Sequence, residues 1–266
     1  MGDDGLGRSL EGARAVVTGC ARGIGGAIAE AMAAAGADVA GLDLQDLSAT
    51  ESAVAQMGSQ VIMRQADVRS QEEVMRVANE VAEAWGGIDV WVNNAGVILS
   101  RPFLELSEED WDRVIRTNLL GYVNGCRAAI THMIAGSGGV IVNVSSVTDI
   151  QPVANLACYI TSKGGVVGLT KALAVEYGPV GIRVNALAPG AVDTELNAEV
   201  WTEEVRTNYK AKSPVGRIAQ PDDIAGVAVF LASESARYLT GVELLVDGGL
   251  VLNGNVGHRT GASQGG

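Results

Sequence analysis

The stretch from Ala13 to Asp43 constrains the fold more than any other part of this sequence. Ala13–Thr18 is a short apolar run typical of a buried strand, and the glycine-rich TGCARGIG (Thr18–Gly25) ends it. An alanine-rich helix is expected from there to about Ala35, and a second apolar run ends at Asp43. A strand, a helix and a strand in this order predict a βαβ unit with parallel strands.

The same alternation continues along the chain, and no linker divides it. We therefore predict an α/β chain with one domain over residues 1–266, with flexible tails at 1–10 and 254–266 and a mobile amphipathic insert at 193–215 beside the substrate. Further strands are predicted at 61–67, 88–94, 138–146, 182–190 and 242–249, and helices at 70–85, 107–135 and 221–231, with one more that carries Tyr159 and Lys163 and runs to Gly178.

Charge and cysteine usage exclude several classes of function. The net charge of −12 disfavours binding to nucleic acids and to anionic membranes. Cys20, Cys126 and Cys158 lie far apart, so neither a metal site nor a disulfide framework is expected, which fits a reducing cytoplasm. The first twelve residues lack the apolar run of a signal peptide, and no segment reaches the about 18 apolar residues of a membrane span. We expect a cytoplasmic protein whose partner is a small molecule.

The turn after the first strand is a candidate dinucleotide site. Glycines there let the backbone approach a pyrophosphate, and the following helix offers free N–H groups to it. Asp43 lies 18 residues after Gly25, where a carboxylate can accept hydrogen bonds from both ribose hydroxyls and would repel a 2′-phosphate. Arg22 argues the other way, because it lies close enough to reach such a phosphate. We expect NAD, with NADP as the alternative.

Tyr159 and Lys163 are candidates for proton transfer. Four residues apart, they would share one face of a helix. A phenol has an ordinary pKa of about 10, and a cation about 4 Å away at an effective dielectric of about 20 would lower it by roughly three units. A tyrosine with such a pKa could exchange a proton with an alcohol oxygen near neutral pH.

From about Leu10 to Leu252 the chain resembles the short-chain dehydrogenase/reductase family. The motifs that carry the resemblance occur in order, and Ser146 lies 13 residues before Tyr159, which is the family's usual spacing. The family implies one doubly wound Rossmann-type domain, a seven-stranded parallel sheet with helices on both faces, and a homotetramer. The motifs are TGCARGIG, Asp67-Val68, Asn93-Asn94-Ala95-Gly96, Asn118, Ser146, the Tyr159/Lys163 pair, Pro189-Gly190 and TGVELLVDGG.

The resemblance also implies roles for individual residues. Tyr159 would give or take the proton, and Lys163 would lower the pKa of that tyrosine and bind the nicotinamide ribose. Ser146 would hold the substrate oxygen, with Ser145 as the competing choice, and Asn118 would fix a water that links Lys163 to solvent. The implied cofactor contacts are Gly19, Arg22, Gly23, Ile24, Gly25, Asp43, Asp67, Val68, Asn94, Gly96, Tyr159, Lys163, Pro189, Gly190, Val192 and Thr194.

The expected substrate pocket is mostly apolar, which favours a fairly hydrophobic secondary alcohol or its ketone. One alternative is an NADPH-dependent 3-ketoacyl reductase, but the cations that grip an acidic carrier are missing at 133–137 and 175–176. The other is a catalytically silent dinucleotide-sensing protein, which would not need the complete set of Ser146, Tyr159 and Lys163. The pocket residues are expected to be Val97, Ile98, Leu99, Val147, Ile150, Val153, Leu156, Leu196, Val200 and Trp201, with Asp149, Gln151 and Asn155 as polar members.

Overall fold

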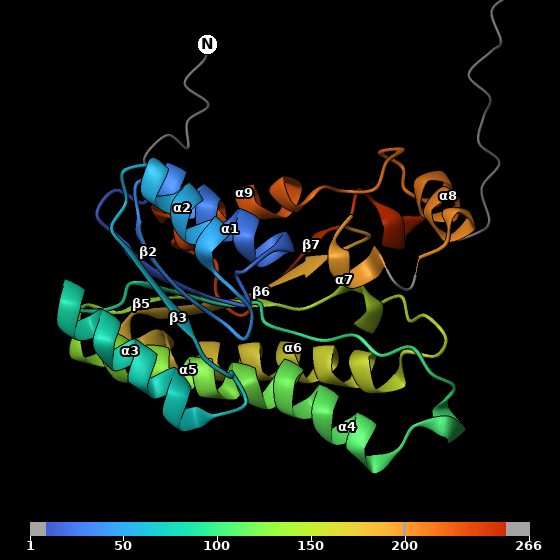
Figure 1. Cartoon of the computed structure of the whole chain (residues 1–266), viewed down its shortest axis with the longest axis horizontal. Coiled ribbons are helices and arrows are strands. Elements are labelled where there is room, and N and C mark those ends of the chain that lie inside the picture. The colour runs from blue at the N-terminus through green and yellow to red at the C-terminus, as the bar shows by residue number, and fades with distance from the viewer. Residues whose placement is uncertain (1–8, 199–200, 254–266) are drawn as a thin grey trace, which may run out of the picture.

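The computed structural model describes residues 9–198 and 201–253, and in this part of the chain seven parallel strands form one sheet (Figure 1). Their order is β3-β2-β1-β4-β5-β6-β7. The predicted α/β class and seven-stranded parallel sheet are therefore confirmed. The strands are β1 (Arg14–Thr18), β2 (Asp38–Asp43), β3 (Val61–Gln65), β4 (Val90–Asn93), β5 (Gly139–Val144), β6 (Ile182–Pro189) and β7 (Glu243–Val246).

Helices cover both faces of the sheet, as predicted. Figure 1 shows α1, α2 and α9 on one face, and α3, α4, α5 and α6 on the other. The helices are α1 (Gly23–Ala34), α2 (Ser48–Gln56), α3 (Gln71–Trp85), α4 (Glu108–Ile115), α5 (Gly121–Ala135), α6 (Ala157–Tyr177), α7 (Glu195–Ala198), α8 (Glu203–Lys212) and α9 (Pro221–Ala232), with short 3₁₀ turns η1 (Phe103–Glu105), η3 (Val147–Asp149), η4 (Gly178–Val180), η5 (Glu234–Ala236) and η6 (Leu250–Leu252). None of these described helices is both long and apolar enough to span a bilayer.

The two helical layers explain why the strands are apolar throughout. On β1, Ala15 and Val17 pack toward α1 and α9, whereas Val16 packs toward α3 and α5. A strand that is buried on both faces has no solvent side, so polar residues do not alternate along it. The polar groups of the chain gather instead where the strands end.

The structure corrects two predicted helical regions. No helix was expected between Asp43 and Val61, yet α2 lies there; within it Thr50 and Val54 are the buried residues, too few for a helical period to show in the sequence. The single helix predicted from 107 to 135 is instead α4, a π-helical turn η2 (Arg116–Leu120) and α5. In that turn the Gly121 N–H donates to the Arg116 carbonyl, five residues earlier.

The predicted tails fall largely outside the described residues, which begin at Ser9 and end at Asn253. Leu10, assigned to the first tail, is buried, and its N–H donates to the Ala35 carbonyl at 2.9 Å. The insert at 193–215 carries α7 and α8. The chain is therefore anchored at Leu10, just before the first strand.

Candidate active site

A cavity of about 470 Å³ lies where strands β1 to β6 end. The strand order reverses between β1 and β4, and ligands of open α/β sheets bind at such a reversal, beyond the carboxyl ends of the strands. Every residue expected to contact the cofactor lines this cavity, and so does Ser146. Asn118, the remaining predicted catalytic residue, is fully buried and does not line it.

The glycine-rich turn is closed by contacts that leave no room for side chains. A Cβ on Gly25 would lie 2.1 Å from the Gly19 carbonyl oxygen, and one on Gly19 would lie 2.6 Å from the Ala95 Cα. The Asn94 side chain braces the turn from β4, donating to the carbonyls of Thr18 (3.1 Å) and Gly19 (2.9 Å). The backbone therefore faces the cavity directly, as a dinucleotide pyrophosphate requires.

Asp43 stands at the end of β2 with its carboxylate held in place. Its Oδ2 accepts from the Ala21 N–H at 3.0 Å, and its Oδ1 accepts from the Gln45 N–H at 2.9 Å. Arg22 lies at the same end of the cavity and is exposed, with no ion pair to any described residue. The anionic group at this position is therefore fixed, while the cation beside it is unpaired in this part of the chain.

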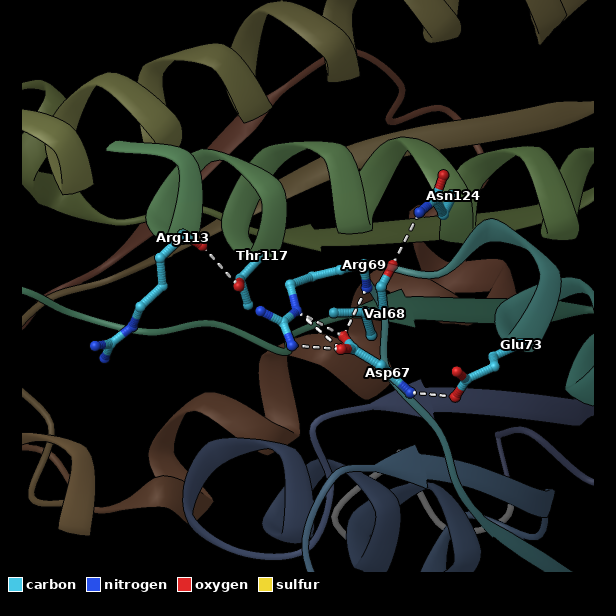
Figure 2. Close-up of polar contacts among 7 residues, drawn as sticks. All are labelled: Asp67, Val68, Arg69, Glu73, Arg113, Thr117 and Asn124. Atoms are coloured by element: carbon cyan, nitrogen blue, oxygen red, sulfur yellow. Dashed lines mark hydrogen bonds and ion pairs between the residues drawn. The ribbon is translucent and has the colours of Figure 1, made fainter. Parts of the chain in front are cut away.

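Beyond β3, a turn from Asp67 to Arg69 forms the far end of the cavity (Figure 2). Arg69 pairs with the Asp67 carboxylate at 2.6 Å and holds the pKa of Asp67 below its ordinary value. The turn is tied to α3 by Glu73, which accepts from the Asp67 N–H (2.9 Å), and to α5 by Asn124, which donates to the Val68 carbonyl (2.9 Å). Two helices thus set the position of Asp67 and Val68.

Three residues in Figure 2 line this end of the cavity although the sequence analysis did not single them out: Arg69, Arg113 and Thr117. Arg113 belongs to α4 and Thr117 to the π-helical turn, whereas Arg69 follows β3. Arg113 and Thr117 lie four residues apart, about one helical turn, whereas Arg69 lies more than 40 residues before them. No motif in the sequence links Arg69 to the other two, so the sequence analysis could not group all three.

Tyr159 and Lys163 lie one helical turn apart on α6 and both line the cavity. The Lys163 Nζ is 5.7 Å from the centroid of the Tyr159 ring and only 3% of the residue is exposed. Burial lowers the pKa of Lys163 to about 7, because a charged amine loses hydration there. A lysine with this pKa is a fixed cation only below neutral pH.

The expectation that Lys163 lowers the pKa of Tyr159 is wrong for this structure. Burial raises the pKa of Tyr159, and a hydrogen bond with Ser146 opposes that shift in part. The error arose because the sequence estimate counted the attraction of a cation and left out the desolvation of both groups.

Tyr122 completes the surroundings of Lys163, and the sequence analysis missed it. The Lys163 Nζ donates to the Val144 carbonyl at 2.8 Å and to the Tyr122 hydroxyl at 3.3 Å, and the same hydroxyl donates to the Val144 carbonyl at 3.0 Å. Tyr122 lies four residues after Asn118, one turn along the chain. That spacing was a usable signal, since both residues then face α6.

The two candidate serines are separated by their partners. Ser145 Oγ donates to Glu243 Oε1 at 2.9 Å, so this hydroxyl is directed to β7. Ser146 Oγ accepts from the Thr148 N–H (3.3 Å) and hydroxyl (3.0 Å), and it hydrogen-bonds the Tyr159 side chain. Only Ser146 is therefore directed at the tyrosine, as the sequence spacing suggested.

Asn118 joins α6 to the loop after β4. Its Oδ1 accepts from the Val97 N–H at 2.8 Å, and its Nδ2 donates to the Val97 carbonyl (2.8 Å) and to Ser162 Oγ (3.2 Å). The side chain is thus fully engaged with the protein. Asn118 lies in the π-helical turn, where the register of backbone hydrogen bonds shifts, and its role in fixing a water stays a prediction.

The part of the cavity where the substrate is expected is lined mostly by apolar residues. Of the apolar residues expected there, Leu99 and Ile150 do not line the cavity, and Val200 lies outside the described residues. Asp149 and Asn155 do not line it either, whereas Gln151 does. The lining residues at this end are Val97, Ile98, Val147, Thr148, Gln151, Val153, Leu156, Leu196, Asn197, Trp201, Tyr209 and Leu250.

Comparison with known proteins assigns the family. A family model described as enoyl-(acyl carrier protein) reductase matches residues 19–251. The chain is 42% identical over 248 residues to 3beta-hydroxysteroid dehydrogenase 1 of Eggerthella lenta, covering 91% of this chain and 95% of that protein. It is 41% identical over 246 residues to D-threitol dehydrogenase of Mycolicibacterium smegmatis, covering 91% and 94%.

Solved structures agree with this assignment. A short-chain type dehydrogenase/reductase from Mycobacterium marinum superposes with a TM-score of 0.87 at 33% identity, covering 92% of this chain and 97% of the other. Carveol dehydrogenase from Mycobacterium avium, in complex with NAD, gives 0.86 at 30% identity, covering 92% and 99%. The chain belongs to the short-chain dehydrogenase/reductase family of oxidoreductases, which use nicotinamide dinucleotides.

Proposed function

We propose that this protein is an NAD-dependent oxidoreductase that interconverts a fairly hydrophobic secondary alcohol and its ketone. The observation that carries the proposal is the convergence of Ser146, Tyr159 and Lys163 at a cavity with a glycine-lined cradle at one end and apolar walls at the other. When bound, the dinucleotide supplies the hydride acceptor or donor. The protein supplies binding, orientation and the movement of the proton.

The proton chemistry follows from the contacts of the two hydroxyls. Thr148 donates to Ser146, which leaves the Ser146 proton available to Tyr159 and to a substrate oxygen. We assign to Tyr159 the exchange of a proton with that oxygen. When Tyr159 gives its proton to the substrate oxygen, Lys163 can take a second proton from water in the cavity that both residues line, because its pKa of about 7 leaves it largely neutral above that pH. The resulting ammonium would then favour the phenolate beside it.

The choice of NAD rests on Asp43. Its carboxylate is held at the end of β2 by two backbone N–H groups, where a 2′-phosphate would meet a negative charge. The exposed Arg22 is the reason to keep NADP as the alternative. In Asp43→Ala the ratio of kcat/KM for NADP to that for NAD should rise at least about tenfold, since a repulsion of this kind contributes more than about 1.4 kcal/mol. An unaltered ratio would contradict the assignment.

The apolar walls favour a hydrophobic substrate. The two relatives named above act on a steroid and on a polyol by name, so similarity alone does not choose between these classes. The seven apolar predicted residues that line the cavity, from Val97 to Trp201, support the first class. The acyl-carrier description of the family model keeps a 3-ketoacyl reductase as the second candidate, and the net charge of −12 counts against an acidic carrier.

A panel of secondary alcohols with NAD, followed by nicotinamide absorbance, tests the proposal. Tyr159→Phe should lower kcat on the best substrate by at least about 100-fold, because general acid–base catalysis contributes about 10²–10⁴. Binding of the dinucleotide should persist in that variant. Comparable turnover by Tyr159→Phe and the wild type would refute the proton-transfer role. If the wild type binds the dinucleotide but turns over none of the tested alcohols, ketones and ketoacyl thioesters, the dinucleotide-sensing alternative is supported.

We also propose a single-domain subunit over residues 1–266, a cytoplasmic location and a homotetramer. The family resemblance supports the assembly, and three free, buried cysteines fit a reducing compartment. The insert at 193–215, whose Leu196, Trp201 and Tyr209 line the cavity, is proposed to cover the substrate. The molar mass from light scattering checks the tetramer. The mass of a monomer at assay concentration would refute it.

A further inference from the structure

Two carboxyl groups meet behind the candidate catalytic serine. Asp149 is the last residue of η3, the short turn that directly follows Ser146, and Glu243 is the first residue of β7. Their side chains lie within hydrogen-bonding distance of each other. Asp149 Oδ1 is buried and has no hydrogen-bond donor among the described residues, while Glu243 Oε1 accepts from Ser145 Oγ at 2.9 Å. The cluster does not line the cavity, except through Ser145.

An ionised carboxylate can only accept hydrogen bonds, so two of them in contact repel and satisfy nothing. If one holds a proton, it becomes a donor and the buried oxygen of the other gains its partner. Burial is the main cause that raises the pKa of both groups; their contact raises the pKa of Glu243 further and lowers that of Asp149. Because glutamic acid also has the higher ordinary pKa of the two, the shared proton is assigned to Glu243.

The charges around the pair are consistent with one shared proton. Among the described residues, Lys171 on α6 is the cation that acts on both Asp149 and Glu243. With one proton, the pair carries a single negative charge, which Lys171 balances. With none, the partly buried cluster would carry an excess negative charge beside Ser145.

We propose that Glu243 is a positioning residue of the active site, which carries a proton and donates it in a hydrogen bond to Asp149. Through this bond and the one from Ser145, a single side chain on the edge strand holds the residues on both sides of the segment that contains Ser146. The claim about Ser146 rests on the proposed function, whereas the protonated pair does not.

The pH dependence of this contact follows from the raised pKa of Glu243. Because that pKa is higher in the folded protein than in the unfolded chain, the stabilisation is complete at low pH and is lost as pH rises through the folded value. The hydrogen bond from Glu243 to Asp149 is therefore lost when the pH is raised and kept when it is lowered.

Infrared spectroscopy tests the proton directly. The difference spectrum between the wild type and Glu243→Gln at neutral pH should show the C=O stretch of one protonated carboxylic acid. The spectrum of Asp149→Asn should lack this band, because the asparagine amide donates the hydrogen bond to Glu243 instead. Glu72→Gln, an exposed change on α3, should keep the band. A wild-type spectrum without this band would overturn the proposal.

Kinetics then tests the positioning. Glu243→Met should lower kcat about tenfold with the KM for NAD unchanged, since loss of alignment acts on the chemical step. Glu243→Gln, which can accept from Ser145 and donate to Asp149, should restore most of kcat and should no longer lose thermal stability, relative to Glu72→Gln, as pH rises. Wild-type kcat in Glu243→Met would refute the positioning role. If the wild type turned over none of the tested substrates, the proposed function would be refuted. The infrared band would still show whether Glu243 and Asp149 share a proton.

Discussion

Replacing Lys163 with methionine should flatten part of the pH dependence of folding stability. In the unfolded chain this lysine has an ordinary pKa of 10.5, and in the folded protein burial lowers it to about 7. Between these values the unfolded chain binds one proton more, so the free energy of unfolding of the wild type rises with pH. Below about pH 7 that stability is lost, because both states are protonated and the charged amine is buried.

The magnitude follows from the shift. Each unit of pKa corresponds to about 1.4 kcal/mol, and the amine of the folded protein is already half deprotonated at its pKa, so the wild type should gain about 2 kcal/mol relative to Lys163→Met between about pH 7 and pH 9. The whole shift, from 10.5 to about 7, corresponds to about 5 kcal/mol. Loss of the bonds to Val144 and Tyr122 adds an offset that does not change with pH in this range.

Urea unfolding at several pH values measures this difference, at one protein concentration so that assembly contributes equally. Lys212→Met is the matched control, because that lysine is exposed at the end of α8. Its stability should follow the wild type at every pH. Parallel curves for the wild type and Lys163→Met would show that Lys163 is not neutral in the folded protein, and the proton exchange assigned to it would be wrong.

Two further substitutions probe the framework of the site. Gly25→Ala should raise the KM for NAD more than about tenfold, because its Cβ would lie 2.1 Å from the Gly19 carbonyl oxygen and would force the turn to shift. The effect on folding stability should be the smaller of the two. Titration of dinucleotide binding checks this prediction, and wild-type affinity would contradict it. Asn118→Ala removes three hydrogen bonds to Val97 and Ser162 and should lower unfolding stability by about 2–4 kcal/mol, measured in urea; a change below about 0.5 kcal/mol would mean that water replaces the amide.

The order of elements and the ring of residues around the cavity could be predicted because their signals are local. The apolar run before Gly19 and the carboxylate at Asp43 each occupy a few neighbouring positions, and parallel strands bring their ends to one edge. The helix α2 left no such signal, since Val54 and Thr50 are its buried residues. The π-helical turn around Asn118 was equally hidden, because its residues suit an ordinary helix.

The protonation states could not be predicted, because they depend on burial. A sequence shows that Lys163 follows Tyr159 by one turn, but not that only 3% of the lysine is exposed. The spacing to Tyr159 favoured Ser146 over Ser145, but the partner that turns Ser145 away is Glu243, 98 residues later in the chain. Glu243 belongs to the motif TGVELLVDGG, yet the motif alone does not show that its side chain meets Ser145; that contact follows from the folded arrangement.

The hydrogen bonds from Asn94 to the carbonyls of Thr18 and Gly19 make the shape of the proposed cofactor turn depend on the pairing of β4 with β1. A shortened chain that stopped before Asn94 would contain the entire first βαβ unit, yet its glycine turn would have lost the amide that holds it open toward the ligand. Under the proposed function, nucleotide affinity therefore depends on the pairing of the central strands, and a ligand that binds the turn would stabilise the docking of β4 in return.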